Sequence, residues 1–276
     1  MRWVVERDPA AYAARVLPWL ERDPVGNTVQ ATLVIAALDD DFEADPLWLA
    51  WLAGGDGEVA GVALRTPPRG ILVSALPAGG AAALAEVAQP RLPGAAGQPA
   101  EVRAFLRAYA ARHRARPVIR MRQRLFRLDE LLPPPLPAGR LREAVEADVP
   151  LMARWYADFA AEMRDSFEQD WLGATRRVVA QRRLLVWEAG GEPVSMVAHR
   201  QPVVGVPRVG PVYTPPEHRR RGYAAATTAG TCERLLRAGA RAVVLFADTA
   251  NPTSTGVYLR LGFRPVAEQE DWSLEY

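Results

Sequence analysis

The apolar positions in the second half of the chain follow two spacings, that of one helix face and that of extended strands. Asp148 is predicted to cap a helix whose apolar positions recur every three or four residues: Leu151, Met152, Trp155, Phe159 and Met163. Further helices are predicted at 170–183, 222–238 and 252–261. Short apolar runs predict strands at 141–145, 184–188, 193–201, 208–214, 242–247, 263–266 and 271–276. Because this order mixes hairpins with crossovers, it predicts the α+β class with a mixed sheet.

The first half of the chain repeats part of this order. Its predicted strands and helix at 57–65, 70–76 and 81–88 correspond to 191–199, 208–213 and 222–238. The two halves are separated by a Pro-rich stretch, Leu132-Pro133-Pro134-Pro135-Leu136-Pro137-Ala138-Gly139, which cannot continue a helix and favours an extended connector. The predicted organisation is therefore one domain at 1–132, a linker at 133–139 and a second domain at 140–276.

Composition excludes several kinds of chemistry. The 276 residues carry 34 basic and 32 acidic side chains, and every basic one is Arg. Without Lys, the chain has no lysine nucleophile and no Walker-type phosphate loop. One Cys and three His, far apart in sequence, exclude an intramolecular disulfide and a Cys-cluster metal site, and no metal is expected. The N-terminus lacks the apolar core of a signal peptide and no apolar run could span a bilayer, so a soluble cytoplasmic protein is predicted.

A predicted strand, a Pro-stiffened turn and a helix start meet at 209–224. Arg219, Arg220, Arg221 and Gly222 open the helix. Unpaired amides and the positive end of the helix dipole attract a diphosphate there, arginine adds charge, and glycine lets a ligand approach the backbone. The alternative is a solvated basic helix start.

Two motifs carry a resemblance to a known family. Residues 219–224 resemble the Arg/Gln-x-x-Gly-x-Gly/Ala acyl-CoA signature of the GCN5-related N-acetyltransferase (GNAT) superfamily, and 251–263 resemble its Asn…Tyr-x-x-x-Gly-Phe segment. The order of predicted elements in 140–276 agrees with that family. The first half looks like a degenerate copy without the phosphate loop, so the chain is similar to tandem-GNAT proteins of the mycothiol-synthase type, though shorter. The resemblance implies two GNAT-like domains, each a mixed, mostly antiparallel sheet flanked by helices.

By resemblance, the second domain is catalytic and binds acetyl-CoA. The cofactor-binding residues implied are Val212, Tyr213 and Thr214 along the pantetheine arm, the amides of Arg219, Arg220, Arg221, Gly222, Tyr223 and Ala224 at the pyrophosphate, and Asn251. Tyr258 matches the family's general acid. Glu162 is the predicted general base, with Glu188 acting through water and Asp248 as alternatives. His199, His218 and Cys232 are interpreted as structural or solvent-facing.

The predicted function is an acetyl-CoA-dependent N-acetyltransferase, an enzyme of the acyltransferase class, that acts on the amine of a small molecule or peptide. The alternative is a non-catalytic acyl-CoA-binding sensor or scaffold. The Arg-rich segment 101–127 raises a third possibility, contact with nucleic acid, but it lacks a recognised nucleic-acid module. In a chain without Lys, it is better interpreted as a solvated helix or a domain interface. The expected assembly is a monomer or a homodimer, with no membrane partner.

Overall fold

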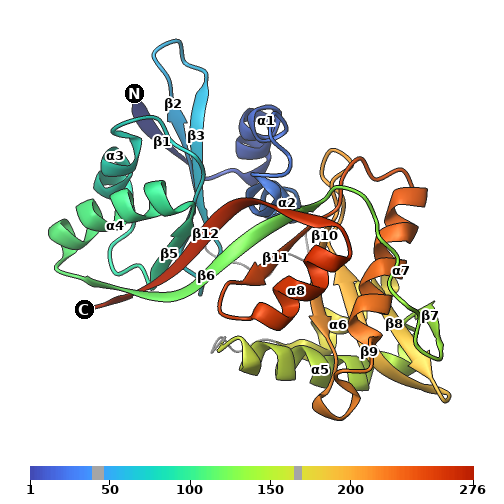
Figure 1. The fold of residues 1–276 in the computed structure, drawn as a ribbon. Coiled ribbons are helices and arrows are strands. Elements are labelled where there is room, and N and C mark those ends of the chain that lie inside the picture. The colour runs from blue at the N-terminus through green and yellow to red at the C-terminus, as the bar shows by residue number, and fades with distance from the viewer. Residues whose placement is uncertain (39–46, 165–169) are drawn as a thin grey trace. The chain divides into compact units, whose positions relative to one another are not determined.

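The computed structural model describes residues 1–38, 47–164 and 170–276. Its contacts divide the chain into two compact units. Unit 1 comprises 1–125, 248–250 and 266–276, and unit 2 comprises 126–247 and 251–265. Two long strands, β6 (Arg116–Leu128) and β12 (Phe263–Glu275), contribute to both units and lie side by side (Figure 1).

This division differs from the boundaries predicted from sequence. The units meet at 125–126 within β6, whereas the Pro-rich stretch lies inside unit 2 and holds no helix or strand from 131 to 139. Residues 266–276 belong to unit 1 because β12 continues past its first residues to pair with a strand of that unit. Separate folding of 1–132 and 140–276 therefore stays a prediction.

Unit 1 is a mixed sheet with helices. Its helices are α1 (Pro9–Leu20), α2 (Thr28–Ala36), α3 (Gly80–Val87) and α4 (Pro99–His113). Its remaining strands are β1 (Arg2–Glu6), β2 (Trp48–Ala53), β3 (Val59–Arg65), β4 (Ile71–Val73) and β5 (Gly94–Gly97). The order is β1-β2-β3-β4-β5-β12-β6, and from β1 to β12 only β4 and β5 pair in parallel.

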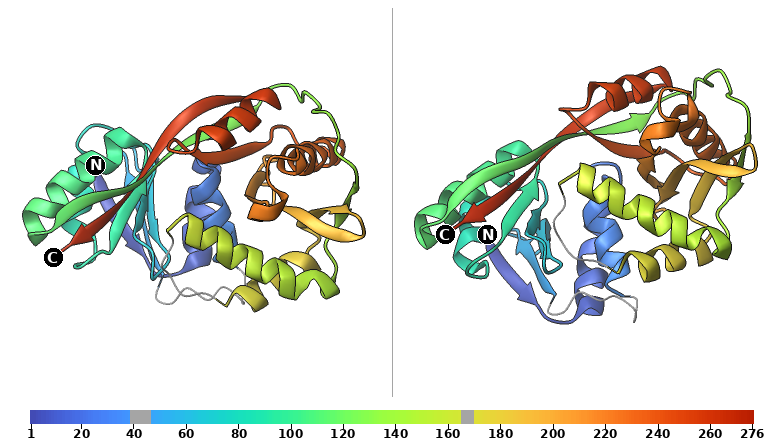
Figure 2. Two further views of the ribbon diagram at one scale, coloured as in Figure 1. Left: turned by 60° about the horizontal axis from the view of Figure 1, so that its bottom comes forward. Right: turned by 90° about the horizontal axis from the view of Figure 1, so that it is seen from below.

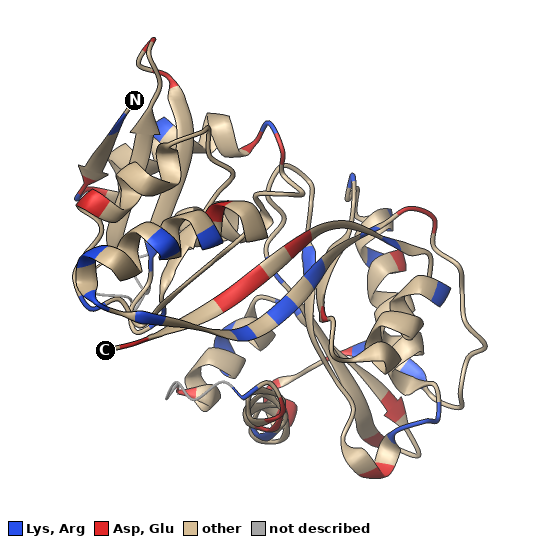
Figure 3. Cartoon of the chain, turned by 60° about the vertical axis from the view of Figure 1, so that its left-hand side comes forward, with Lys and Arg blue, Asp and Glu red and all other residues tan. Residues whose placement is uncertain are grey.

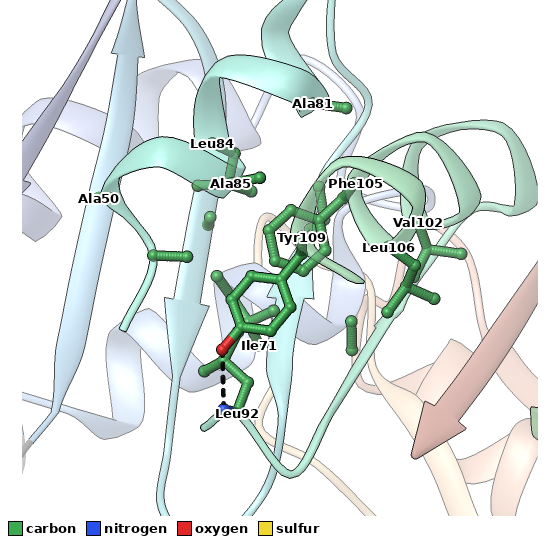
Figure 4. Close-up of a cluster of buried hydrophobic side chains, with 14 of the residues drawn as sticks. Ala50, Ile71, Ala81, Leu84, Ala85, Leu92, Val102, Phe105, Leu106 and Tyr109 are labelled. Carbon is green, nitrogen blue, oxygen red and sulfur yellow. Dashed lines mark hydrogen bonds between the residues drawn. The ribbon is translucent and has the colours of Figure 1, made fainter. Parts of the chain in front are cut away.

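The core of unit 1 lies between this sheet and helices α3 and α4 (Figure 4). Phe105 and Tyr109, one helical turn apart on α4, are fully buried against Leu84 of α3 and Ile71 of β4. The Tyr109 hydroxyl accepts a hydrogen bond from the Leu92 amide at 3.0 Å, which satisfies a polar atom that burial would otherwise leave unpaired. The four-residue spacing of the two rings is what one helix face requires.

Charged side chains on β6 and β12 explain the Arg-rich segment (Figure 3). Five of its nine arginines pair with carboxylates of β12: Arg103 and Arg122 with Glu270, Arg116 with Glu275, Arg120 with Asp271, and Arg124 with Glu268. Glu270 is only 3% exposed, and it accepts from Arg103 Nε at 2.8 Å and from Trp272 Nε1 at 3.0 Å. Much of the positive charge is thus neutralised within unit 1, which removes the main support for nucleic-acid contact.

Replacing Glu270 with Gln should destabilise the protein most at neutral pH. The hydrogen bond from Arg103 holds the pKa of Glu270 below its usual range. Its stabilisation is therefore complete above about pH 4.3, the unfolded value, and is lost as the pH falls through the lower folded value. We expect a loss of about 1–2 kcal/mol at pH 7 that shrinks towards pH 3, measured by urea unfolding. The control is Glu192→Gln, because Glu192 is an exposed carboxylate with no ion pair in the described ranges. This variant should leave the free energy of unfolding unchanged at pH 7 and at pH 3. An equal loss at both pH values would contradict this account.

Unit 2 is a second mixed sheet. Its helices are α5 (Val149–Glu162), α6 (Trp171–Ala180), α7 (Tyr223–Arg237) and α8 (Pro252–Arg260). Its own strands are β7 (Arg140–Glu143), β8 (Leu184–Ala189), β9 (Glu192–His199), β10 (Arg208–Tyr213) and β11 (Val244–Asp248). They are ordered β6-β11-β10-β9-β8-β7, with β10 and β11 parallel and β10 to β7 antiparallel.

Successive residues of β9 pack against opposite helical layers of unit 2. Figure 2 shows the ribbon of these helices and strands from two further sides. Met196 and Ala198 pack with residues of α5 and α6, whereas Val197 packs with residues of α7 and α8. This alternation is the two-residue period of a strand that is covered on both faces. The predicted fold class, mixed and mostly antiparallel sheets flanked by helices, is confirmed in both units.

Two local predictions for the second half of the chain are wrong. Asp148 lies at the N-cap of α5, but its carboxylate bonds to Arg142 and to the Val145 amide, and it caps no amide of α5. The strands predicted at 263–266 and 271–276 form one strand, β12, which ends at Glu275. The polar residues between them keep the strand continuous because the buried Glu270 is matched by arginines. Asp170, by contrast, caps α6 by accepting from the Gly173 amide at 2.9 Å.

Candidate active site

Strand β10 separates from its parallel neighbour β11 after two residues. Arg208 pairs with Val244 and Val209 with Leu245, and no pairing follows, although β10 continues beside β9 to Tyr213. A bulge in the β9 pairing lies between Val209 and Val212. After Val209, the edge of β10 that faces β11 therefore has no strand paired to it, although β10 lies inside the sheet rather than at its margin. Because backbone polar groups need partners, such an edge is suited to a ligand with amide groups of its own.

The loop after β10 ends in a helix start with free amides. Arg220 and Gly222 have positive φ angles, 61° and 85°, and the first backbone bond of α7 joins the Ala226 amide to the Gly222 carbonyl at 3.0 Å. Within the described ranges, no hydrogen bond uses the amides of 220–225. A side chain built on Gly222 would meet no atom within 4 Å. Successive free amides in such a turn form an anion-binding concavity at the positive end of a helix.

Arg219 turns back towards the end of β10, unlike the next two arginines. Its Nε donates to the Thr214 carbonyl at 2.9 Å, its guanidinium pairs with Glu162 of α5, and it lies 5.8 Å from the centre of the Tyr213 ring. Burial, together with the charges of Asp158 and Glu162, raises the pKa of Tyr213. Arg220 and Arg221 are exposed and have no ion pair in the described part of the chain. Both side chains are therefore available to an anion at this helix start.

Tyr258 lies where the two separating strands share a hydrophobic cluster. That cluster joins Val209 and Val212 of β10 to Leu245 of β11 and Cys232 of α7. The Tyr258 ring packs edge-on against Phe263 at 6.0 Å, and its hydroxyl has no hydrogen-bond partner among the described residues. Burial raises the pKa of this hydroxyl above its ordinary value, so it holds its proton at neutral pH.

The family comparison agrees with this geometry. Residues 151–263 match the model described as the Acetyltransferase (GNAT) family. This segment is a GNAT-family domain.

Solved structures extend the likeness of fold beyond the GNAT domain. An X-ray structure of a Drosophila protein covers 99% of this chain and 98% of its own at 14% identity, with a TM-score of 0.68. A GNAT-family acetyltransferase from Colwellia psychrerythraea covers 100% of both chains at 10% identity (TM-score 0.65). A GCN5-related N-acetyltransferase from Sphaerobacter thermophilus covers 98% and 95% at 18% identity (TM-score 0.63). These full-length matches agree with the predicted repeat, and at such identities they show the fold alone. No curated protein matches in sequence.

Two other predicted site residues of the GNAT domain differ in whether their side chains remain available to a ligand. Asn251 caps α8 by accepting from the Ser254 amide at 3.0 Å, which leaves its side-chain NH₂ without a described partner. Glu188 is held by Arg142 and Arg140, and their hydrogen bonds lower its pKa. A general base needs a pKa near the working pH, so this pairing favours a structural role for Glu188.

The remaining titratable groups considered from sequence also have local contacts. Asp248 accepts from the Ala250 amide at 2.8 Å. Burial lowers the pKa of His199, which keeps this ring neutral, and its Nδ1 lies 3.2 Å from the Arg200 carbonyl. His218 packs edge-on to Tyr223. Cys232 is buried, and burial raises the pKa of its thiol to about 12, as expected for a core residue.

Sequence reasoning missed the polar contacts that fix the end of β10. Ser195 on β9 lies 2.9 Å from Thr214 Oγ1 and donates to the Tyr213 carbonyl at 3.2 Å. Trp155 of α5 packs against Tyr213 at 6.1 Å. The only signal in the sequence was a serine in an apolar strand, which is too common to single out. In the described ranges no cluster of His, Cys, Asp and Glu could hold a metal, and no helix could cross a membrane.

Proposed function

We propose that the GNAT domain binds acetyl-CoA and transfers the acetyl group to the amine of a small molecule or peptide. The observation that carries this proposal is the separation of β10 from β11 beside a helix start with six free amides. The unpaired strand edge suits the amides of a pantetheine arm. The amides of 220–225, with Arg220 and Arg221, suit a diphosphate.

The acceptor amine must lose a proton before it can react. An amine with a pKa near 10.4 is neutral in only about one molecule in 2,500 at pH 7, so desolvation or a base must assist. Acetyl-CoA supplies the acetyl thioester. As the nitrogen of the neutral amine bonds to the carbonyl carbon, the carbon–sulfur bond breaks, the nitrogen releases its surplus proton to solvent, and the leaving sulfur takes up a proton. Tyr258 is the proposed donor of that proton, because it packs where β10 and β11 separate and its hydroxyl carries a proton at neutral pH.

The equivalent part of unit 1 supports its description as a degenerate copy. Strands β4 and β5 stay paired over all three residues of β4, and a side chain on Gly97 would come within 2.7 Å of the Val73 carbonyl. Helix α3 begins after Gly79, whose φ of 81° resembles that of Gly222, but its loop carries no arginine. We therefore propose one acetyl-CoA site per chain.

Calorimetry and thiol release test the proposed function on the intact chain. We expect acetyl-CoA to bind with a stoichiometry of one, and free thiol to appear only when a suitable amine is added. Failure to bind acetyl-CoA would overturn the proposal. Binding without turnover over a broad amine panel would favour the second candidate, an acyl-CoA-binding sensor or scaffold.

Glu162 has two possible roles that one substitution separates. Its pairing with Arg219 suggests that it positions this arginine, whereas the sequence predicts a general base. If it positions Arg219, Glu162→Gln should raise the KM for acetyl-CoA about 2- to 5-fold, as the loss of an exposed ion pair does, and leave kcat and its pH profile unchanged. Loss of a general base should instead lower kcat by about 100-fold or more and remove its acidic limb. The matched control is Glu217→Gln. Glu217 is an exposed carboxylate in the loop between β10 and α7, close in sequence to Arg219, and it has no ion pair among the described residues.

A further inference from the structure

Three arginines gather at the end of the unit 2 sheet where β8 begins, β9 ends and β10 begins. The His199 amide donates to the Arg183 carbonyl at 3.0 Å, and the Arg200 amide donates to the Arg208 carbonyl at 2.8 Å. These two bonds place Arg183 opposite His199 and Arg208 opposite Arg200, so the backbones of the three arginines lie within one residue of each other across the three strands. We call these three residues the arginine cluster.

The arginine cluster has no carboxylate partner in the part of the chain that the structure describes. Seven other arginines of unit 2 do pair with carboxylates in the described ranges: Arg140, Arg142, Arg176, Arg182, Arg219, Arg234 and Arg237. Arg183 donates to the neutral Gln181 side chain, and the enclosed Arg208 Nη1 has no hydrogen-bond partner among the described residues. An enclosed cation without a partner is costly, so its retention points to an anion that binds there.

The electrostatics agree with this geometry. Burial, with the nearby charge of Arg200, lowers the pKa of Arg208 to about 9, and the same two causes lower the pKa of Arg183. No carboxylate of the described residues contributes to either shift. A bound anion would reverse this repulsion, because it favours the charged form of each guanidinium.

Aromatic side chains stand beside the cluster. Tyr156 of α5 stacks on Trp171 of α6, with ring centres 6.3 Å apart and planes inclined by 17°. The charges of Arg200 and Arg183 act on the Tyr156 hydroxyl, which has no hydrogen-bond partner among the described residues. The cluster therefore combines cations with an apolar wall and a free hydroxyl, the mixture that small-molecule sites use.

Strand β10 connects the cluster to the proposed reaction site. Arg208 directly precedes Val209, the last residue of β10 that pairs with β11, whereas the phosphate-binding loop follows Tyr213 at the other end. Six strand residues separate the two ends by about 20 Å. An acceptor at the arginine cluster would thus approach the point of separation from the end opposite the phosphates.

We infer that the arginine cluster binds an anionic group of the acceptor, so that the preferred substrates are amines carrying a carboxylate or a phosphate. This inference rests on the proposed function, and it names the substrate class. Arginine donates charged hydrogen bonds to the anionic oxygens of either group. The turnover assay below distinguishes carboxylates from phosphates because it includes amines of both kinds.

The turnover test compares amines that differ only in charge. Glycine, β-alanine, 4-aminobutyrate and 6-aminohexanoate are each paired with the corresponding primary amide, and phosphoethanolamine is paired with ethanolamine. We expect at least one acid to exceed its neutral partner by about 10-fold or more in kcat/KM, as a charged hydrogen bond implies. Arg200→Gln and Arg208→Gln should reduce that ratio to within about 3-fold and leave acetyl-CoA affinity unchanged. Arg237→Gln, an exposed arginine of α7, is the control and should retain the preference. A neutral or cationic amine as best substrate, unaffected by these variants, would overturn the inference.

A second measurement does not depend on turnover. Inorganic phosphate should raise the Tm of the intact chain, and this rise should be reduced in the Arg200→Gln and Arg208→Gln variants. In phosphate-free buffer, Arg208→Gln should raise Tm by about 2–4 °C because it removes an unpartnered enclosed cation. An unchanged phosphate response in both variants would overturn the inference even if the chain failed to bind acetyl-CoA. Loss of acetyl-CoA binding with an intact, cluster-dependent phosphate response would instead contradict the proposed function alone.

Discussion

Replacing Gly222 with Ala should weaken acetyl-CoA binding by about 100-fold or more, which is about 2.7 kcal/mol of binding free energy. The residue has a φ of 85°, a conformation that costs an L-residue about 1 kcal/mol relative to Gly. The added methyl group would also project into open space beside the free amides of 220–225. A diphosphate seated on those amides would meet it. Isothermal titration with acetyl-CoA measures the effect directly.

Gly239 provides a matched control for Gly222. It follows the other end of α7, has a φ of 92°, and a side chain there would also meet no atom within 4 Å. Gly239→Ala should therefore lose about the same stability, about 1 kcal/mol, with no loss of acetyl-CoA affinity. If both variants lost affinity equally, the effect would come from general destabilisation, and the amide concavity would not be the binding site.

Replacing Tyr258 with Phe should lower kcat by about 100-fold or more while changing the Kd for acetyl-CoA by less than about 3-fold. The hydroxyl has no partner among the described residues, and the ring keeps its packing on Phe263, so the variant should be as stable as the wild type. A non-catalytic sensor would show little change in this variant. Stopped-flow measurement of thiol release, together with acetyl-CoA titration, separates the two outcomes.

The pH profile gives the same role a second test. Because burial raises the pKa of Tyr258, the acid form persists above the ordinary value near 10. The wild-type kcat should therefore show no alkaline decline between pH 7 and 10.

Tyr12→Phe is the control, because its hydroxyl, unlike that of Tyr258, is hydrogen-bonded within the protein. The Tyr12 hydroxyl lies 3.1 Å from the Ala50 carbonyl and 3.2 Å from the Ala63 carbonyl in unit 1. That variant should lose about 1 kcal/mol of stability and keep its kcat. A Tyr258→Phe variant with full kcat would exclude the hydroxyl as the acid.

The helices and the conformation of the loop at 219–224 could be predicted because their signals are local. The apolar face of 151–163 repeats within a few residues, so α5 (Val149–Glu162) lies within two residues of its predicted position. Position 222 favours glycine because its φ is positive. The neighbouring amides are free because the first amides of a helix have no partner within the helix. None of these features depends on a distant part of the chain.

The predictions from sequence were wrong where a polar residue has a partner far away in the chain. The stretch around Glu270 appeared to end a strand, but Arg103 and Arg122 bury and match its charge, and β12 continues through it. Asp148 has the sequence position of a cap, but Arg142 takes its carboxylate. In each case a partner outside the residue's own helix or strand decided what a polar residue does, and periodicity does not report partners.

The sequence by itself determined the order of helices and strands from β7 to α8, the loop at 219–224 and the absence of lysine chemistry. Local periodicity, backbone preference and composition are properties of neighbouring residues, so these features follow without any knowledge of distant contacts. Only the tertiary structure decided that β10 leaves β11 after Val209, that Glu162 holds Arg219, and that three arginines without a carboxylate partner in the described ranges lie at one end of the sheet. Those features depend on strand register and on which charges meet across the fold, and such pairing energies join residues that the sequence keeps far apart.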